Sequence, residues 1–190
     1  MTAPAVTYGS TGGFGAITGF EEQSSSSTPT QSRVSALTKD GDVAASSLIN
    51  DVTEVSSSYQ AATDAATVPP DIGAIINAYL LTGIDINTTA EAYATMNLTG
   101  HNHTNNPHTT GMRKCTHAIT LAKCFGATDF LAGTAGDNAT VKSGTISIKC
   151  EHVDENDSLG KHFCGENYNV TIEAKTTWLG VPTAVGGTGF

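Results

Sequence analysis

The chain has 190 residues, of which only 14% are charged, and its formal net charge is −9 at pH 7. This length suits one domain with a core of its own. Globular proteins average about 25% charged residues, so this chain has few side chains with which to cover exposed helices. The composition therefore favours a β-rich protein, and the acidic balance argues against binding nucleic acid by counterion release.

The first twenty residues lack a basic segment followed by an apolar one, and no stretch reaches the roughly 18 apolar residues of a membrane span. We therefore expect a soluble, unsecreted protein with no membrane span. In that setting its cysteines are expected to be free thiols or metal ligands rather than disulfides.

Residues 1–32 are rich in glycine and contain four consecutive serines at positions 24–27, with almost no periodic apolar pattern. Such a segment buries little apolar surface by itself. It is expected to be a flexible arm, or an arm that becomes ordered only against a neighbouring subunit. Residues 33–190 are expected to form a single domain.

An Asp-Gly pair at Asp40 and Gly41 lies between two segments of β-forming residues. Glycine accepts a positive φ without a steric clash, so this pair predicts a hairpin with strands near 33–39 and 43–49. Asn50 and Asp51 indicate a second turn, after which Val52 would begin a third strand.

The segment after Pro69 and Pro70 is ambiguous. A helix would place four apolar residues on one stripe, whereas Gly73 and Gly83 weaken a helix and favour strands. We expect two short strands broken at Asn77, with the helix as the alternative. The residues of the possible helical stripe are Ile72, Ile75, Ile76 and Tyr79.

Further strands are predicted by apolar residues that alternate with polar ones, because successive strand side chains point to opposite faces. Three sets each share one face: Ala92, Ala94, Met96 and Leu98; Cys115, His117, Ile119 and Leu121; and Ile146, Ile148, Cys150 and His152. The longest alternation is that of Tyr168, Val170, Ile172, Ala174, Thr176 and Trp178 with Asn169, Thr171, Glu173, Lys175 and Thr177. Many strands separated by turns and long loops predict a mostly β protein, an antiparallel sandwich or barrel.

Cysteine and histidine occur three times at a spacing of two, which on a strand places both side chains on one face. These pairs are Cys115 with His117, Cys150 with His152, and His162 with Cys164. They predict a candidate closed, structural zinc site, with small buried thiols and core histidines as the alternative. The loop that contains His101, His103 and His108 could add imidazoles.

No nucleophile elbow, phosphate-binding loop or dinucleotide-binding pattern occurs in a strand-to-helix setting, so we expect no enzymatic activity. The segment from Glu151 to Asp157 carries four carboxylates but lacks the spacing of an EF-hand. It is expected to be a solvated acidic loop.

Three segments resemble the tail tube proteins of long-tailed bacteriophages and related tube proteins of contractile injection machines. They are LTKDGDVAASSLINDVTEVSSSYQA, TGIDINTTAEAYATMNLTG and YNVTIEAKTTW. The resemblance covers about two thirds of the chain, from residue 33 onward, and is one of pattern rather than of an invariant motif. It implies a β-sandwich or barrel whose sheets join into hexameric rings, which stack into a tube.

The same resemblance implies a virion protein, assembled in the host cytoplasm, whose partners are copies of itself and other virion proteins. Genomic DNA would pass an acidic lumen without specific binding. The glycine-rich first thirty residues and the region rich in cysteine and histidine depart from the family pattern. These departures leave two alternatives: a capsid decoration or head-to-tail completion protein, and a metal-binding β module.

Overall fold

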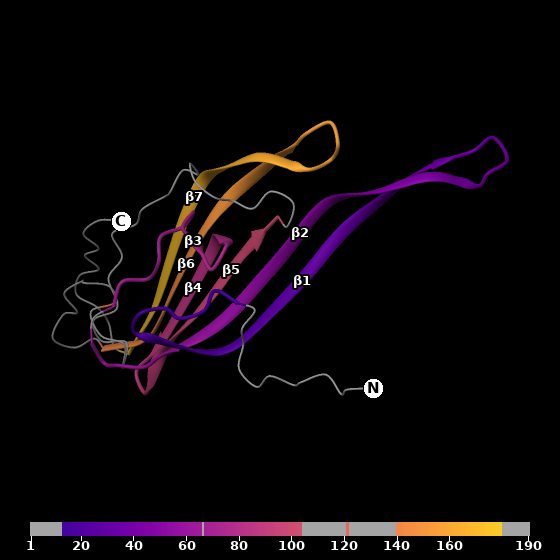
Figure 1. The fold of residues 1–190 in the computed structure, drawn as a ribbon. Coiled ribbons are helices and arrows are strands. Elements are labelled where there is room, and N and C mark those ends of the chain that lie inside the picture. Colours follow the sequence, from indigo (N-terminus) through magenta and orange to yellow (C-terminus); the bar gives the residue numbers. More distant parts are fainter. Residues whose placement is uncertain (1–12, 66, 104–120, 122–139, 180–190) are drawn as a thin grey trace, which may run out of the picture.

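The computed structural model describes residues 13–65, 67–103, 121 and 140–179. Its strands are β1 (Phe20–Leu37), β2 (Val43–Ala61), β3 (Ile75–Ile76), β4 (Tyr79–Thr89), β5 (Ala92–Asn102), β6 (Thr140–Asn156) and β7 (His162–Leu179). They form one sheet in the order β1-β2-β5-β4-β6-β7, with β3 paired to β4 (Figure 1). Every pairing is antiparallel.

The prediction of a mostly β, antiparallel fold is confirmed. All strands of the described residues belong to a single sheet, so the sandwich or barrel arrangement stays a prediction. In the same part of the chain, no helix has the length and apolar character needed to cross a membrane.

Two rows of buried side chains cross one face of the sheet, each with one residue from every central strand. The rows are Tyr59, Met96, Ile86 and Ile146, and then Ser57, Leu98, Ile84 and Ile148. Burying one large aliphatic side chain contributes about 1.5–3 kcal/mol, so these rows hold the sheet together. The predicted alternation in β5 is confirmed for Ala94, Met96 and Leu98, which are buried between exposed neighbours, whereas Ala92 at the start of the strand is exposed.

The predicted Asp-Gly hairpin is confirmed and forms the tip of a long projecting arm. Gly41 has φ +88°, and the turn is closed by a hydrogen bond of 2.7 Å from the Thr38 amide to the Asp42 carbonyl. β2 pairs with β5 only from Thr53 onward, so the outer halves of β1 and β2 pair with each other alone among the described strands. We call residues 33–48 the arm, which stands clear of the rest of the sheet (Figure 1).

β1 begins at Phe20, which places residues 20–32 in the sheet rather than in a separate N-terminal segment. The serines at 24–27 pair in register with β2, where Ser25 lies opposite Ser57 and Ser26 opposite Ser56. The Ser25 and Ser57 hydroxyls are 3.1 Å apart and share a hydrogen bond. Residues 1–12 of the N-terminal segment expected to be flexible lie outside the described residues.

The turn predicted at Asn50 and Asp51 is wrong, because β2 runs without interruption from Val43 to Ala61. Asn50 has φ +53°, and the register with β1 shifts between Thr30 and Ser32. Asparagine tolerates the left-handed region better than most residues, and this tolerance is used for a β-bulge rather than a chain reversal.

The two short strands expected around Asn77 are confirmed as β3 and β4. Asn77 and Ala78 both have positive φ, at 49° and 70°, and form the tight connection between them. Asn77 is held by a hydrogen bond of 2.7 Å from its side-chain nitrogen to the Gly13 carbonyl. The helix is therefore not formed.

The long C-terminal strand is confirmed as β7, which pairs with β6. Its predicted alternation is interrupted at Asn169, which has φ +47°, because the register with β6 shifts there, and Tyr168 and Val170 are both exposed. The strand expected to carry Cys115, His117 and Ile119 lies outside the described residues. Its last residue, Leu121, is buried and forms a β-bridge with Thr67.

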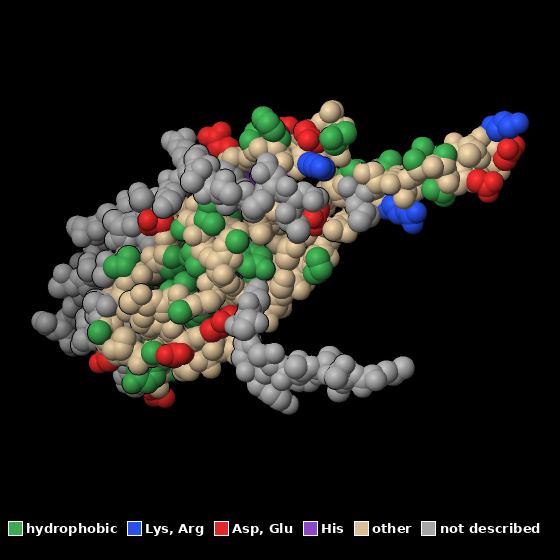
Figure 2. Space-filling view, viewed as in Figure 1, with side chains coloured by type: hydrophobic (Ala, Val, Ile, Leu, Met, Phe, Trp, Pro, Cys, Tyr) green, Lys and Arg blue, Asp and Glu red, His purple; other side chains and the backbone are tan. Residues whose placement is uncertain are grey.

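β1 and β7 are the two edges of the sheet, and no other strand of the described residues pairs with their outer sides. Residues 23–32 of β1 carry no charge, and β7 contains one lysine, Lys175. Apolar side chains are also exposed along the arm, where Val34 is 53% and Leu37 63% exposed. Charged side chains gather at the tip of the arm (Figure 2).

Candidate functional site

Four histidines surround one aspartate in the described structure. The Oδ1 atom of Asp154 lies 2.7 Å from Nε2 of His152 and 3.1 Å from Nε2 of His162. Its Oδ2 atom lies 3.1 Å from Nε2 of His103 and 3.5 Å from Nε2 of His101. All four imidazoles therefore turn the same ring nitrogen toward a single carboxylate. We call these five residues the His–Asp cluster.

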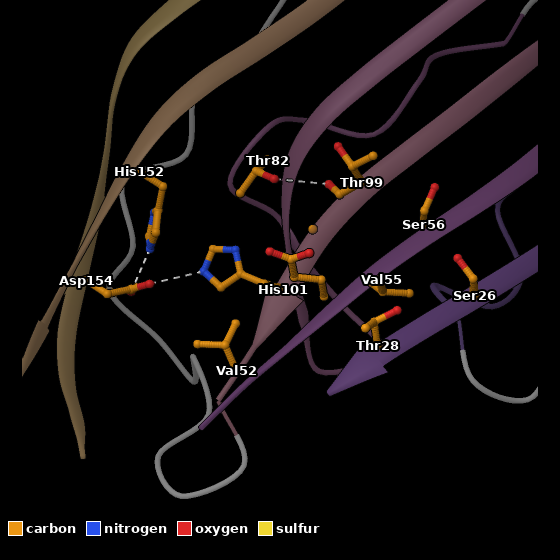
Figure 3. Close-up of a pocket in the computed structure, with 12 residues that line it drawn as sticks. Ser26, Thr28, Val52, Val55, Ser56, Thr82, Thr99, His101, His152 and Asp154 are labelled. Atoms are coloured by element: carbon orange, nitrogen blue, oxygen red, sulfur yellow. Dashed lines mark hydrogen bonds and ion pairs between the residues drawn. The ribbon is translucent and has the colours of Figure 1, made fainter. Parts of the chain in front are cut away.

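The cluster lies where β4 separates from β6. β4 pairs with β6 only as far as Gly83 opposite Lys149, although β6 continues to Asn156. Before Gly83, β4 still pairs with β5, where Leu80 lies opposite His101, but it no longer pairs with β6. In the space left between β4 and β6, His101 faces Asp154 on β6 (Figure 3). His152 shares the inward direction of Asp154 because the two residues are two apart on a strand.

The outer ring nitrogens of two cluster histidines face oxygen atoms. Nδ1 of His103 lies 3.0 Å from the backbone carbonyl oxygen of Asp51, and Nδ1 of His152 lies 2.5 Å from the side-chain oxygen of Asn167. These contacts fix the orientation of both rings, so that each Nε2 points inward. The rings of His103 and His162 also stack, with centroids 4.0 Å apart.

The bulge in β2 brings the strand against the turn that joins β6 to β7. The Asn50 amide donates a hydrogen bond of 3.2 Å to the Gly160 carbonyl, and its side-chain oxygen accepts one of 2.9 Å from Asn156. The next residue, Asp51, presents the carbonyl that holds His103. The bulge is thus a structural support of the cluster.

Gly165 leaves room for the cluster on β7, directly opposite Asp154 in the register. A Cβ atom at this position would lie 2.6 Å from Asp154 Oδ1 and 2.9 Å from His152 Nε2. Any side chain at this position would displace the carboxylate or the ring. The close approach therefore requires glycine.

Contacts between Asp154 and the imidazoles change the protonation of the cluster. Burial tends to raise the pKa of the Asp154 carboxyl, but hydrogen bonds with His101, His103 and His152 hold this pKa well below its usual range. Burial tends to lower the pKa of His152, but hydrogen bonds with Asp154 and Asn167 and the negative charge of Asp154 raise it above the ordinary value. The site therefore favours an ionised carboxylate.

A pocket of about 570 Å³ opens beside the cluster and reaches His101, His152 and Asp154 (Figure 3). Most of its remaining lining is hydroxyl side chains from β1, β2, β4 and β5, with the carboxylate of Glu54. Ser56 and Thr99 alternate with the core residues of their strands, so they project from the opposite face of the sheet. The pocket provides solvent with a polar path to Asp154.

Of the six residues predicted as zinc ligands, the structure brings together two, His152 and His162. Cys150 is partly buried against the core, and its thiol donates to the Thr82 carbonyl at 3.5 Å. Cys164 is exposed. A register shift at the end of the hairpin breaks the alternation between His162 and Cys164, so they do not share a face. Cys115 and His117 lie outside the described residues.

The expectation of a solvated acidic loop at 151–157 is wrong for Asp154, which is the centre of the cluster. Asp157 instead caps the turn, where Oδ1 accepts hydrogen bonds from the amides of Leu159 and Lys161. The sequence feature that could have indicated Asp154 as a site residue is its spacing from His152. The two residues are two apart, the same spacing as in the three pairs of cysteine and histidine. From the sequence alone, His101 and His103 are predicted only as additional imidazoles.

Comparisons with known protein families, with curated proteins and with solved structures found no match for this chain. The interpretation of the site therefore depends on its own chemistry. Neutral imidazole nitrogens and a carboxylate are donors for transition metal ions, and both kinds meet here. The described part of the site includes no thiolate.

Proposed function

We propose that the protein is a non-enzymatic structural subunit that joins copies of itself edge to edge, as a tail tube subunit of a virion does. The observation that carries this proposal is the pair of long, lightly charged edges, β1 and β7, on one antiparallel sheet. Natural proteins usually block such edges with lysine, proline or a covering element. β1 carries one proline, Pro29, and β7 none, and no other strand of the described residues covers either edge. Such edges favour pairing with another chain.

The direction of the strands supports head-to-tail assembly. Five antiparallel steps separate β1 from β7, so these edges run in opposite directions. The β1 strand of a second copy, placed beside β7 in the same orientation, therefore continues the antiparallel pattern. A contact between two different surfaces generates a closed ring when the rotation closes.

The arm and the net charge fit the same proposal. The arm exposes Val34, Leu37 and Val43 away from the core, where a neighbouring subunit would cover them. The net charge of −9 would allow DNA to pass through a ring without being bound. Two parts of the proposal, the virion and the stacked hexameric rings, come from the resemblance of three segments to tail tube proteins.

Negative-stain electron microscopy and light scattering of the purified chain test the proposal. Rings or tubes with an open lumen are expected. Val170→Lys places a charge on the β7 edge and should reduce the ring population, because lysine disfavours edge pairing. Thr95→Lys is the matched control, since Thr95 is exposed on β5, whose two sides are already paired.

A uniform population of monomers or trimers would contradict the tube proposal and favour a capsid decoration protein. Equal loss of rings in both lysine variants would also count against edge pairing, since only one of them changes an edge.

A further inference from the structure

We propose that the His–Asp cluster binds one late first-row transition metal ion of the Zn²⁺ class, held between β5, β6 and β7. The donors are Nε2 of His101, His103, His152 and His162, with the carboxylate of Asp154. This set differs from the cysteine-containing set predicted from the sequence and contains no sulfur.

The spacing of the donor atoms matches a shared ion. Zinc binds nitrogen and oxygen ligands at about 2.0–2.2 Å, so neighbouring ligand atoms on one ion lie about 3.0–3.4 Å apart. The Nε2 atoms lie between 2.7 and 3.5 Å from the oxygens of Asp154. The ligand atoms of His101, His103 and Asp154 also lie within 4.8 Å of one another. His101, His103 and Asp154 are thus the compact part of the donor set, and His152 and His162 approach the other carboxylate oxygen of Asp154.

The hydrogen-bond partners of His103 indicate a cation at this point. A backbone carbonyl only accepts, so the contact with the Asp51 carbonyl places a proton on Nδ1. A neutral imidazole carries one N–H, which leaves a lone pair on Nε2, aimed at a carboxylate oxygen 3.1 Å away. Two facing lone pairs repel unless a positive charge lies between them.

His152 repeats this arrangement, with Nδ1 toward the Asn167 oxygen and Nε2 toward Asp154. Extra protons could supply the positive charge, but they would create adjacent cationic rings. The ring centroids are 4.7 Å apart for His101 and His152. One divalent ion instead satisfies the Nε2 lone pairs of His103 and His152 together with the carboxylate.

The outer contacts of His103 and His152 follow the usual design of metal sites. A ligating histidine normally donates its other ring N–H to a carbonyl or carboxylate, which fixes the tautomer and the ring orientation. The Asp51 carbonyl and the Asn167 side chain occupy these positions. Gly165 keeps the space around Asp154 open on the β7 side.

The nature of the donors defines the class of ion. Imidazole suits zinc, cobalt, nickel, iron and copper, whereas magnesium and calcium prefer oxygen ligands throughout. The ion would lie in the gap beside β4 and join the end of β5 to the β6–β7 hairpin. We therefore expect it to stabilise that region of the sheet.

Calorimetric titration of the full chain, first stripped of metal with EDTA, tests the proposal with Zn²⁺ as the probe. One equivalent should bind, while Mg²⁺ and Ca²⁺ should not. At free Zn²⁺ of 100 times the dissociation constant, the folding equilibrium constant should rise about 100-fold. Co²⁺ should give weak visible bands without the intense charge-transfer absorption of thiolate.

Two variants locate the ion. His103→Gln should weaken Zn²⁺ binding by at least about tenfold, because removal of even an outer-shell partner costs that much. Gly165→Ala should also weaken binding, although it removes no donor, since its Cβ would displace Asp154. Glu155→Gln is the matched control: Glu155 is an exposed neighbour of Asp154, and its replacement should leave the affinity unchanged.

A measurement on the unaltered chain keeps the test independent of folding defects in the variants. Long-range ¹⁵N–¹H spectra of the histidine rings should show Nε2 of the cluster histidines shift when Zn²⁺ is added. Zn²⁺ binding no tighter than that of Mg²⁺ would overturn the proposal. So would Zn²⁺ binding that persists in His103→Gln and disappears in a His108→Ala/His117→Ala chain.

Discussion

Tyr59 is a fully buried residue of the sheet, and its hydroxyl donates a hydrogen bond of 2.8 Å to the Gly15 carbonyl. Burial, and then the nearby charge of Glu22, raise the pKa of Tyr59 to about 12. The folded state therefore favours the neutral phenol, whose ionisation in the unfolded chain begins near pH 10. This contribution to stability is complete below pH 10 and is lost as the pH rises to about 12.

Urea unfolding between pH 9 and pH 12 measures this effect. The stability of the wild-type chain should fall more steeply than that of Tyr59→Phe, which has no phenol at this position. Equal slopes in the two proteins would show that Tyr59 does not titrate differently on folding.

At the same scale, the sequence predicted the alternation of buried residues but only part of the His–Asp cluster. His152 and His162 were identified because each has a cysteine two residues away. Spacing within one strand, however, carries no information about which other strand lies opposite. The convergence on Asp154 depends on the separation of β4 from β6 at Gly83, which is a property of long-range pairing.

The bulge at Asn50 affects how whole strands pack, because it connects β2 to the β6–β7 turn. Asn50→Val should destabilise the protein by about 1–2 kcal/mol, since residues other than glycine and asparagine are strained at φ +53°. Asn50→Gly keeps this conformation and loses the hydrogen bond from Asn156, a change of about 1 kcal/mol.

Urea midpoints of the two variants should therefore differ, with the valine variant the less stable. If valine were tolerated as well as glycine, the positive φ of Asn50 would not be needed for folding.

Local residue preferences predicted several elements correctly, including the hairpin at Gly41 and the break at Asn77. They also marked Asn50 as an irregular position. Whether a left-handed residue reverses the chain or only bulges it depends on the partner strand. Here β1 continues to pair from Thr30 to Ser32 across the bulge, so the chain keeps its direction.

At the scale of the whole molecule, the body of the sheet should fold without the arm. All residues of the apolar core lie outside 33–48. Replacing residues 34–47 with Asn-Gly, which joins the paired residues Arg33 and Leu48, should change the urea midpoint little. The same deletion should reduce ring formation, because it removes the exposed apolar side chains.

Unfolding curves and electron micrographs of the shortened protein check both parts of this prediction. A large loss of stability would mean that the arm folds as one unit with the core, and undiminished rings would show that the arm is not an assembly contact.

The order of the strands was beyond prediction from the sequence, unlike the β-rich composition of the sheet. Strands that follow one another in the chain are often neighbours, and β1 with β2, β4 with β5 and β6 with β7 obey this tendency. The placement of β4 between β5 and β6 brings together segments that are distant in the chain. It determines both the edges and the position of the cluster.

The continuity of β2 has a mechanical consequence. One strand runs from the tip of the arm to the core residues Val55 and Tyr59. The hydrogen bonds of an antiparallel pair are perpendicular to the strands, so a pull along the arm loads many of them together in shear. Peeling would break them one at a time. Tension applied by a neighbour at the tip would thus be carried by the whole length of β2 into the centre of the protein.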